Sequence, residues 1–333
     1  MSQSDLKPLQ KRLRIGYNAE YAADIMRSDN HDLRTSGHRQ LVKALRRLKL
    51  PGWIGGGVLD WYQIPLRYLR AEEDCETYFG ARIRCATVDF IQRTILFFGV
   101  WEPGISRVIE GTLKPGDVFV DIGANIGYES LLASSVGSRV VAIEPSPATY
   151  SRLTANVSAN PQLSQRIRTV NLAVSDSLGE LDLYEFGAFN SGATTTLASR
   201  RGTKSATVGA SPLLDILTPD ELARVKLIKI DVEGLEPVIL NDILGHLDAY
   251  PSDMSILSEA NPQDDREAFR LLFGRLLAAG FRAFSIENKY SNEWYLKWRP
   301  TPLQRVYEAP AMQSDLLLCR DRRAASAEAG ELA

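Results

Sequence analysis

The stretch VFVDIGANIGYESLLASSV, residues 118–136, places a short apolar run before a glycine-bearing turn and an apolar segment with helical spacing. A strand, a tight turn and a helix in this order are typical of the start of a βαβ unit. The order then repeats, because RVVAIEP at residues 139–145 indicates a strand and residues 147–160 indicate a helix. This alternation predicts an α/β fold with a mostly parallel sheet.

The rest of the chain extends this sheet. Since two strands follow the last long helix, they form a hairpin, and a hairpin brings one antiparallel strand into the sheet. We therefore expect a seven-stranded, mostly parallel sheet with an antiparallel last strand. The further strands are expected at residues 167–173, 225–231, 255–259, 282–286 and 314–319, and further helices at residues 235–244 and 265–279.

The N-terminal part of the chain is its basic part. Residues 1–70 hold 13 Lys or Arg and 6 Asp or Glu, a net charge of +7, whereas the whole chain of 333 residues has a formal charge of −2. Residues 40–50 have the spacing of a basic amphipathic helix, which indicates either a solvated face or contact with a membrane surface or an acidic partner. Pro51 and the glycines at 52 and 55–57 then predict a loop.

Between this basic part and the first core strand, the pattern changes twice. Residues 78–100 are rich in β-branched and aromatic side chains and predict two or three short strands, and residues 105–113 predict a helix. We expect an accessory region at residues 1–100, a main domain at residues 101–320 and a disordered tail at residues 321–333, which offers almost no large apolar side chain to bury.

The cysteines and the apolar runs bear on the cellular location. Cys75, Cys85 and Cys319 are odd in number and far apart, so they predict neither a disulfide framework nor a zinc site. The N-terminus lacks the apolar core of a signal peptide, and the longest apolar stretch, residues 94–101, is too short to span a bilayer. We expect a soluble, cytoplasmic protein, and its weak net charge argues against a nucleic-acid partner.

The turn from Asp121 to Gly127 follows the first core strand, where open parallel sheets bind nucleotide-like ligands. A dinucleotide fingerprint has a middle glycine at the position that Asn125 occupies here. The carboxylate of Asp121 would repel a pyrophosphate, but it suits a ligand with a sulfonium and an ammonium group. Glu144, at the end of the next strand, is placed to accept hydrogen bonds from both ribose hydroxyls. These residues favour S-adenosylmethionine, with an NAD-dependent sugar oxidoreductase as the alternative.

Four segments, DIGANIGYESLLA, IEPSPATYSRLTANVSAN, VNLAVSD and KLIKIDVEGLEPVIL, resemble the FkbM-type methyltransferase family over residues 100–260. The resemblance implies a Rossmann-like methyltransferase fold, S-adenosylmethionine as cofactor, and a hydroxyl of a carbohydrate, glycoconjugate or related metabolite as acceptor. Glu129 departs from the family pattern, in which an aromatic or apolar residue often follows Tyr128. The resemblance also implies the cofactor contacts, with the methionine part at Asp121, Gly123, Ala124, Asn125 and Gly127, the ribose at Glu144, and the adenine at Ala173, Val174 and Ser175.

The segment IDVEG supplies the candidate catalytic groups. Asp231 and Glu233 follow an apolar strand, and Lys229 lies within it. A sugar hydroxyl is a poor nucleophile, so we expect Asp231 or Glu233 to take its proton. Lys229 would either pair with a carboxylate or cover apolar surface with its stem. The alternative is that Asp231 caps the next helix. Glu259 could join the two acids around a divalent ion, but no spacing rule demands this and we predict no metal.

Two further segments are candidates for the acceptor side. Residues 288–309 are dense in aromatic residues, which predict either stacking on a sugar and a lid over the site or packing of the final hairpin. Asn190 and Ser191 lie in a loop rich in Gly and Thr that would approach the acceptor or remain a plain surface loop. A third function, a non-catalytic protein that binds through the basic N-terminal region, also stays open.

Overall fold

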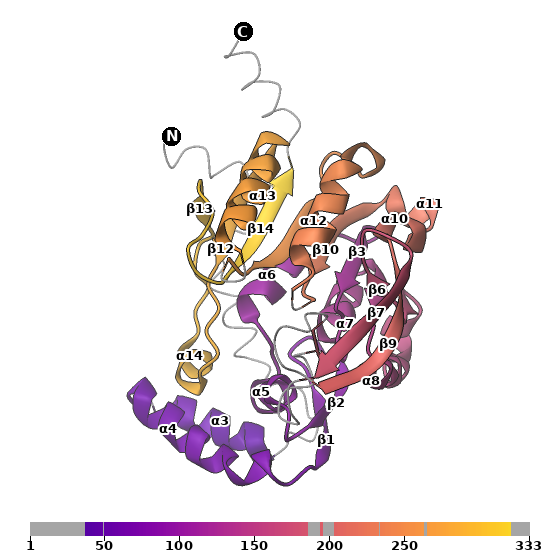
Figure 1. The fold of residues 1–333 in the computed structure, drawn as a ribbon. Coiled ribbons are helices and arrows are strands. Elements are labelled where there is room, and N and C mark those ends of the chain that lie inside the picture. Colours follow the sequence, from indigo (N-terminus) through magenta and orange to yellow (C-terminus); the bar gives the residue numbers. More distant parts are fainter. Residues whose placement is uncertain are drawn as a thin grey trace.

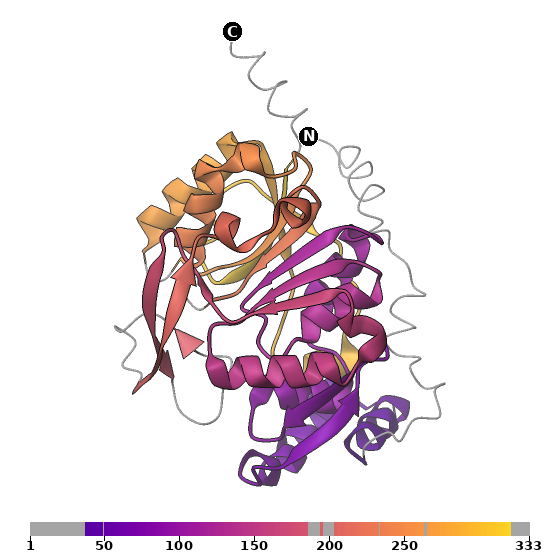
Figure 2. The ribbon, with the colours of Figure 1, turned by 90° about the vertical axis from the view of Figure 1, so that its right-hand side faces the viewer.

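The computed structural model describes residues 37–48, 50–185, 194–195, 203–232, 234–262 and 265–320. At its centre lies an eight-stranded sheet in the order β13-β12-β14-β11-β10-β3-β4-β5 (Figures 1 and 2). The strands are β3 (Val118–Ile122), β4 (Arg139–Ile143), β5 (Ile167–Val170), β10 (Val225–Ile230), β11 (Ser255–Ala260), β12 (Phe281–Ile286), β13 (Gln304–Val306) and β14 (Ser314–Arg320).

The strand directions confirm the expected fold class. From β5 to β11 all neighbours are parallel, and β14 runs antiparallel between β11 and β12. The edge strand β13 pairs antiparallel with β12 and adds an eighth strand to the seven expected. Its three residues are too few to show alternation in the sequence.

Alternate residues of β3 face two different helical layers. Val118, Val120 and Ile122 share one apolar core with α12 and α13, whereas Phe119 shares another with α6, α7 and α8. Strands covered on both faces are apolar at nearly every position, as VFVDI is. The helices are α6 (Pro103–Thr112), α7 (Tyr128–Ser135), α8 (Pro147–Ser158), α12 (Glu236–Gly245) and α13 (Arg266–Ala278).

A second sheet lies beside the first (Figure 2). Its order is β6-β9-β7-β8, and the sequence did not predict it, because the long strands carry many small or charged residues. The predicted loop residues Asn190 and Ser191 lie outside the described residues. The strands are β6 (Ala173–Val174), β7 (Gly179–Glu185), β8 (Thr194–Thr195) and β9 (Thr203–Ser211).

The N-terminal part contains more helix than expected. The predicted basic helix is α3 (Gly37–Arg47), but the loop expected after Pro51 is wrong, because Gly52–Gln63 form the helix α4. The glycines of α4 serve close packing on α14 (Asn292–Lys297): a Cβ on Gly56 would lie 3.0 Å from the backbone nitrogen of Glu293. Glycine is costly in a helix but permits such an approach.

The strands expected at residues 78–100 are wrong in their second half. Only β2 (Arg82–Ala86), paired with β1 (Glu72–Glu76), is a strand, and Phe90–Phe98 form the helix α5. Asp89 accepts a hydrogen bond from the backbone of Gln92 at the start of α5, and Gly99 ends it with φ 70°. Because most of α5 is buried, apolar residues on every side hide the helical period.

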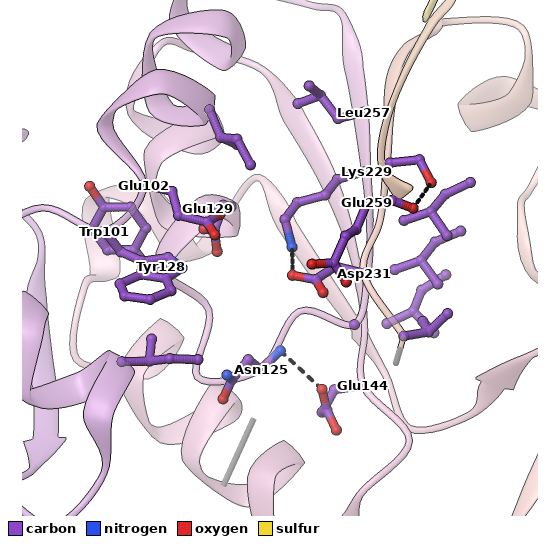
Figure 3. Close-up of a pocket in the computed structure, with 18 of the residues that line it drawn as sticks. Trp101, Glu102, Asn125, Tyr128, Glu129, Glu144, Lys229, Asp231, Leu257 and Glu259 are labelled. Atoms are coloured by element: carbon purple, nitrogen blue, oxygen red, sulfur yellow. Dashed lines mark hydrogen bonds and ion pairs between the residues drawn. The ribbon is translucent and has the colours of Figure 1, made fainter. Parts of the chain in front are cut away.

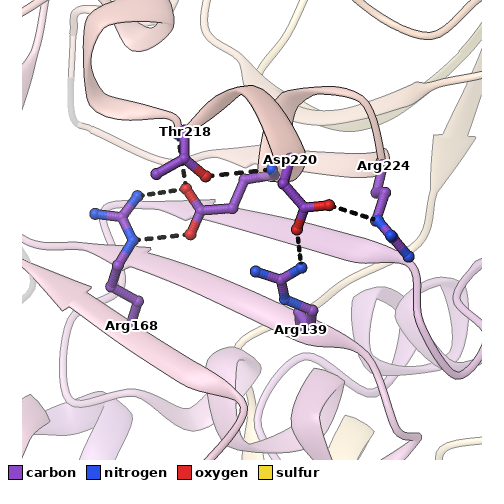
Figure 4. Close-up of polar contacts among 6 residues, drawn as sticks. Arg139, Arg168, Thr218, Asp220 and Arg224 are labelled. Atoms are coloured by element: carbon purple, nitrogen blue, oxygen red, sulfur yellow. Dashed lines mark hydrogen bonds and ion pairs between the residues drawn. The ribbon is translucent and has the colours of Figure 1, made fainter.

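Ion pairs hold the short helix α11 (Pro219–Leu222) against the sheet (Figure 4). Arg168 of β5 contacts both carboxylate oxygens of Glu221, at 2.8 and 2.7 Å, and Glu221 also forms a capping box with Thr218. Asp220 pairs with Arg224 and with Arg139, the first residue of β4. These contacts fix the amino ends of β4 and β5 and leave their carboxyl ends available for a ligand.

Some predictions concern segments or boundaries that the structure leaves untested. Residues 1–36 and the predicted tail at residues 321–333 lie outside the described residues, and the domain boundary at residue 100 stays a prediction. In the part of the chain that is described, no helix is both long and apolar enough to cross a bilayer.

Candidate active site

A cavity of about 300 Å³ opens at the carboxyl ends of the parallel strands (Figure 3). Ile122 of β3, Ile143 of β4 and Ile230 of β10 end their strands at its wall. Ligands of open α/β sheets bind in this position, because the loops that leave the strand ends diverge there. The cavity is therefore the candidate active site.

The loop after β3 forms one side of the cavity. Gly123 has φ 81°, and a Cβ on it would lie 1.9 Å from the carbonyl oxygen of Asp231, so only glycine fits. Asn125 also has a positive φ, 47°, and its backbone nitrogen donates to Glu144 Oε2 at 2.9 Å. The side-chain Oδ1 of Asn125 is buried without a hydrogen-bond partner among the described residues. An orphaned acceptor on a cavity wall fits a ligand that donates a hydrogen bond.

Glu144 follows β4 and lines the cavity beside Asn125. Its carboxylate accepts from two backbone nitrogens, those of Asn125 and of Ser146, the latter at 3.0 Å. Burial raises the pKa of Glu144 to about 7, although the two hydrogen bonds act in the opposite direction and lower it. A carboxylate fixed in this way presents its remaining lone pairs to the cavity, which suits a ribose with two hydroxyl donors.

We expect Glu144→Gln to weaken binding of S-adenosylhomocysteine by about tenfold, because an amide offers one acceptor oxygen where a carboxylate offers two. Since the ionised form accepts the hydroxyls, the wild-type affinity should fall by about tenfold as the pH drops from about 8 to about 6, through the pKa near 7. Calorimetry at several pH values measures both effects. An equal pH dependence in wild type and variant would contradict the assignment of the ribose to Glu144.

The other predicted cofactor residues divide into two groups. Ala173 and Val174 line the cavity, as Gly123, Asn125 and Glu144 do. Four residues lie outside its lining: Asp121, Ala124, Gly127 and Ser175.

Asp121 lies behind the loop, fully buried. Ser130 Oγ donates to its Oδ2 at 2.6 Å, while Oδ1 has no hydrogen-bond partner among the described residues. Burial raises the pKa of Asp121, although the charge of Lys229 opposes this. Asp121 thus contacts α7 behind the cavity wall and does not line the cavity.

Lys229 and Asp231 bring the predicted catalytic segment to the cavity. Lys229 Nζ donates to Asp231 Oδ2 at 2.8 Å, and both residues line the cavity (Figure 3). Burial disfavours the charge of Lys229, but the carboxylates of Asp231, Glu129, Asp121 and Glu102 raise its pKa well above the usual value. Lys229 therefore stays protonated and positions Asp231.

The alternative role of Asp231, a helix cap, has no support in the described contacts. Helix α12 has no side-chain cap at its first position, and Glu236 instead accepts from the backbone nitrogens of Val232, at 3.0 Å, and Gly234, at 2.9 Å. This leaves the carboxylate of Asp231 to Lys229 and the cavity. Glu233 lies outside the described residues, so its predicted role stays a prediction.

Three further carboxylates line the cavity, and the sequence did not assign them a role. Glu102, Glu129 and Asp315 come from α6, α7 and β14, or from the residues next to them. Figure 3 shows Glu102 and Glu129 opposite Lys229 and Asp231. Burial is the main cause that raises the pKa of Glu129 to about 7 and that of Asp315 to about 6. The one signal in the sequence was the unusual acid at Glu129.

The aromatic segment before and within α14 divides between the cavity and an apolar core, and its predicted stacking on a sugar stays a prediction. Tyr290 lines the cavity, donates to Glu102 Oε1 at 2.6 Å and stacks on Trp101, with ring centroids 5.4 Å apart. Tyr295 and Trp298 are buried in the apolar core that α14 shares with the N-terminal helices. No group of three or more potential metal-ligating His, Cys, Asp or Glu side chains occurs among the described residues.

Comparison with known proteins identifies the segment that carries the loop and the Lys229–Asp231 pair. Residues 121–282 match the model of the methyltransferase FkbM domain. The chain carries an FkbM methyltransferase domain. The cofactor of such a methyltransferase is S-adenosylmethionine, and the loop, Glu144 and the orphaned Asn125 Oδ1 fit it. Trp101, Glu102, Tyr290 and Asp315 line the same cavity from outside the FkbM match.

Several solved structures align with parts of the chain at low sequence identity. An FkbM methyltransferase from Methylobacillus flagellatus KT is 12% identical with TM-score 0.39, and the alignment covers 80% of this chain and 60% of that one. An O-methyltransferase from Bacillus cereus, solved in complex with S-adenosylhomocysteine, is 11% identical with TM-score 0.39, over 67% of this chain and 83% of that one. No curated protein matches the chain.

Proposed function

We propose that this protein is an O-methyltransferase that uses S-adenosylmethionine to methylate a hydroxyl of a carbohydrate, glycoconjugate or related metabolite. The observation that carries the proposal is the Lys229–Asp231 pair, which stands in the same cavity as the Gly123 loop and Glu144. A cofactor site and an oriented carboxylate in one cavity are the two requirements for methyl transfer to a weak nucleophile.

The proposed mechanism divides the work between positioning and proton removal. S-adenosylmethionine, when bound, supplies a methyl group on a positively charged sulfur. Lys229 holds Oδ2 of Asp231, which leaves Oδ1 to accept the proton of the acceptor hydroxyl as its oxygen attacks. The charge of Lys229 fixes the orientation of this carboxylate throughout, because four carboxylates keep the lysine protonated.

The lining of the cavity supports a polyhydroxylated acceptor. Glu102, Glu129 and Asp315 offer hydrogen-bond acceptors, and the stacked rings of Trp101 and Tyr290 offer an apolar surface of the kind that packs against sugar rings. The family resemblance points to the same class of acceptor.

Calorimetry with S-adenosylhomocysteine tests the cofactor part. We expect saturable binding by the full chain, and no heat with NADH, which the alternative oxidoreductase would bind. Incubation with S-adenosylmethionine carrying a labelled methyl group and a glycan panel, followed by mass spectrometry, tests the acceptor part. A product labelled on nitrogen or carbon would contradict O-methyl transfer, and binding without any product would favour the non-catalytic alternative.

A further inference from the structure

Large apolar side chains are exposed in one short segment of the N-terminal part. Of the twelve exposed large apolar residues in the described part of the chain, seven lie within residues 48–69. Trp53 is 70% exposed and Trp61 is 74% exposed, although tryptophan is seldom left in solvent to this degree. The seven are Leu48, Trp53, Val58, Trp61, Ile64, Tyr68 and Leu69, and we call them the aromatic patch.

The packing of α4 keeps this patch outside. The opposite side of the helix carries Gly52, Gly55 and Gly56, which meet α14 so closely that a Cβ on Gly52 would lie 2.5 Å from Lys297 Cε. The backbone nitrogen of Glu293 would lie only 3.0 Å from a Cβ on Gly56, and Leu59 is buried, so this packing holds one side of α4 inward and leaves its tryptophans outside. Figure 1 shows α3 and α4 together at one end of the molecule, apart from the central sheet.

The segment that carries the patch is basic in sequence. Residues 37–70 contain seven Lys or Arg and one acid, Asp60. The carboxylate of Asp60 accepts a hydrogen bond from Asn292 Nδ2 at 2.8 Å, so it is held toward α14. Arg67 and Arg70 are exposed beside Ile64, Tyr68 and Leu69. The patch therefore combines tryptophan, aliphatic side chains and positive charge.

We propose that the aromatic patch docks this protein on an anionic lipid surface. Tryptophan and tyrosine prefer the boundary between headgroups and acyl chains, because their rings are apolar while their N–H and O–H groups stay hydrated. Lysine and arginine close to the surface are attracted to acidic lipids. A protein partner would need its own acidic counterpart to this positive charge, whereas an anionic lipid surface presents acidic groups over its whole area.

Vesicle co-sedimentation with the full chain tests the proposal. We expect binding to phosphatidylcholine vesicles that contain phosphatidylserine, weak binding to phosphatidylcholine alone, and release by salt. Trp53→Ala and Trp61→Ala should each weaken binding by about tenfold, as expected for loss of a buried aromatic side chain. Arg67→Gln and Arg70→Gln should each weaken it by about fivefold. Tyr307→Ala is the matched control, because Tyr307 is 62% exposed outside the patch.

Several outcomes would overturn the proposal. Vesicle binding that does not depend on phosphatidylserine would contradict it. Vesicle binding that is unchanged in Trp53→Ala and Trp61→Ala would contradict it as well. A dimer in sedimentation velocity that the two tryptophan variants abolish would assign the patch to a second copy. Vesicle binding that requires removal of residues 1–36 would show that this segment covers the patch. The salt dependence is measured on the unaltered protein, so this test does not require any variant to fold. Methyl transfer to a soluble acceptor should be equal in all variants, because none of the substitutions lies in the cavity.

Discussion

Replacing Asp231 by asparagine is expected to lower kcat by about 10²- to 10⁴-fold, which is the usual contribution of a positioned base. An amide of the same shape can still accept the hydrogen bond from Lys229 Nζ, which now spans 2.8 Å, but it cannot take a proton from the acceptor. Binding of S-adenosylhomocysteine should change little, because the loop at Gly123 and the carboxylate of Glu144 are untouched. Steady-state kinetics and calorimetry on the same preparation separate the two effects.

The control for this variant is Asp215→Asn, which removes an exposed carboxylate outside the cavity and should leave kcat unchanged. Lys229→Met should also lower kcat, since Asp231 then loses the group that orients it. A fully active Asp231→Asn enzyme would assign proton removal to another group, with Glu129 across the cavity as the next candidate.

Gly123→Ala is expected to abolish cofactor binding and to lower the free energy of unfolding by about 2 to 5 kcal/mol. The new Cβ would stand 1.9 Å from the carbonyl oxygen of Asp231, and alanine also disfavours φ 81°. Because the contact is with backbone at a strand end, neither β3 nor β10 can yield without moving the cofactor loop and Asp231 together.

Gly116→Ala separates the two causes. Gly116 has φ 90° with nothing within 4 Å of the added Cβ, so this variant carries the conformational cost alone, about 1 to 2 kcal/mol, and should bind the cofactor normally. Denaturant unfolding compares the two proteins. Equal destabilisation by both substitutions would show that the close approach of Gly123 to Asp231 contributes nothing.

The βαβ core could be predicted from the sequence because each of its elements carries its own signal. VFVDI is apolar at almost every position since both faces of β3 are covered, and the following turn needs Gly123 for its positive φ. The antiparallel β14 followed from the order of the last elements along the chain. In the FkbM domain, the loop, Glu144 and Asp231 follow strands directly and Lys229 lies near the end of β10, so locating the strands also located these groups.

The N-terminal helices were harder to predict because their signals are ambiguous without their partners. The glycines of α4 look like a loop until α14 is present to pack against them, and α5 looks like strands because it is buried on most sides. The exposure of Trp53 and Trp61 likewise depends on tertiary packing, because the glycine side of α4 packs against α14 and leaves the tryptophans on the outer side.

The sequence by itself determined the fold class, the cofactor loop and the acids at the strand ends, because these depend on local pattern and on the fixed geometry of a parallel sheet. Only the tertiary structure decided that Asp121 is buried against α7 outside the cavity lining, that Asp231 pairs with Lys229, and that Glu102, Glu129 and Asp315 share one cavity. These three acids are far apart along the chain, and no spacing rule links them. Their proximity arises when α6, α7 and β14 pack around the same strand ends, and that packing depends on the shape and burial of side chains throughout the core.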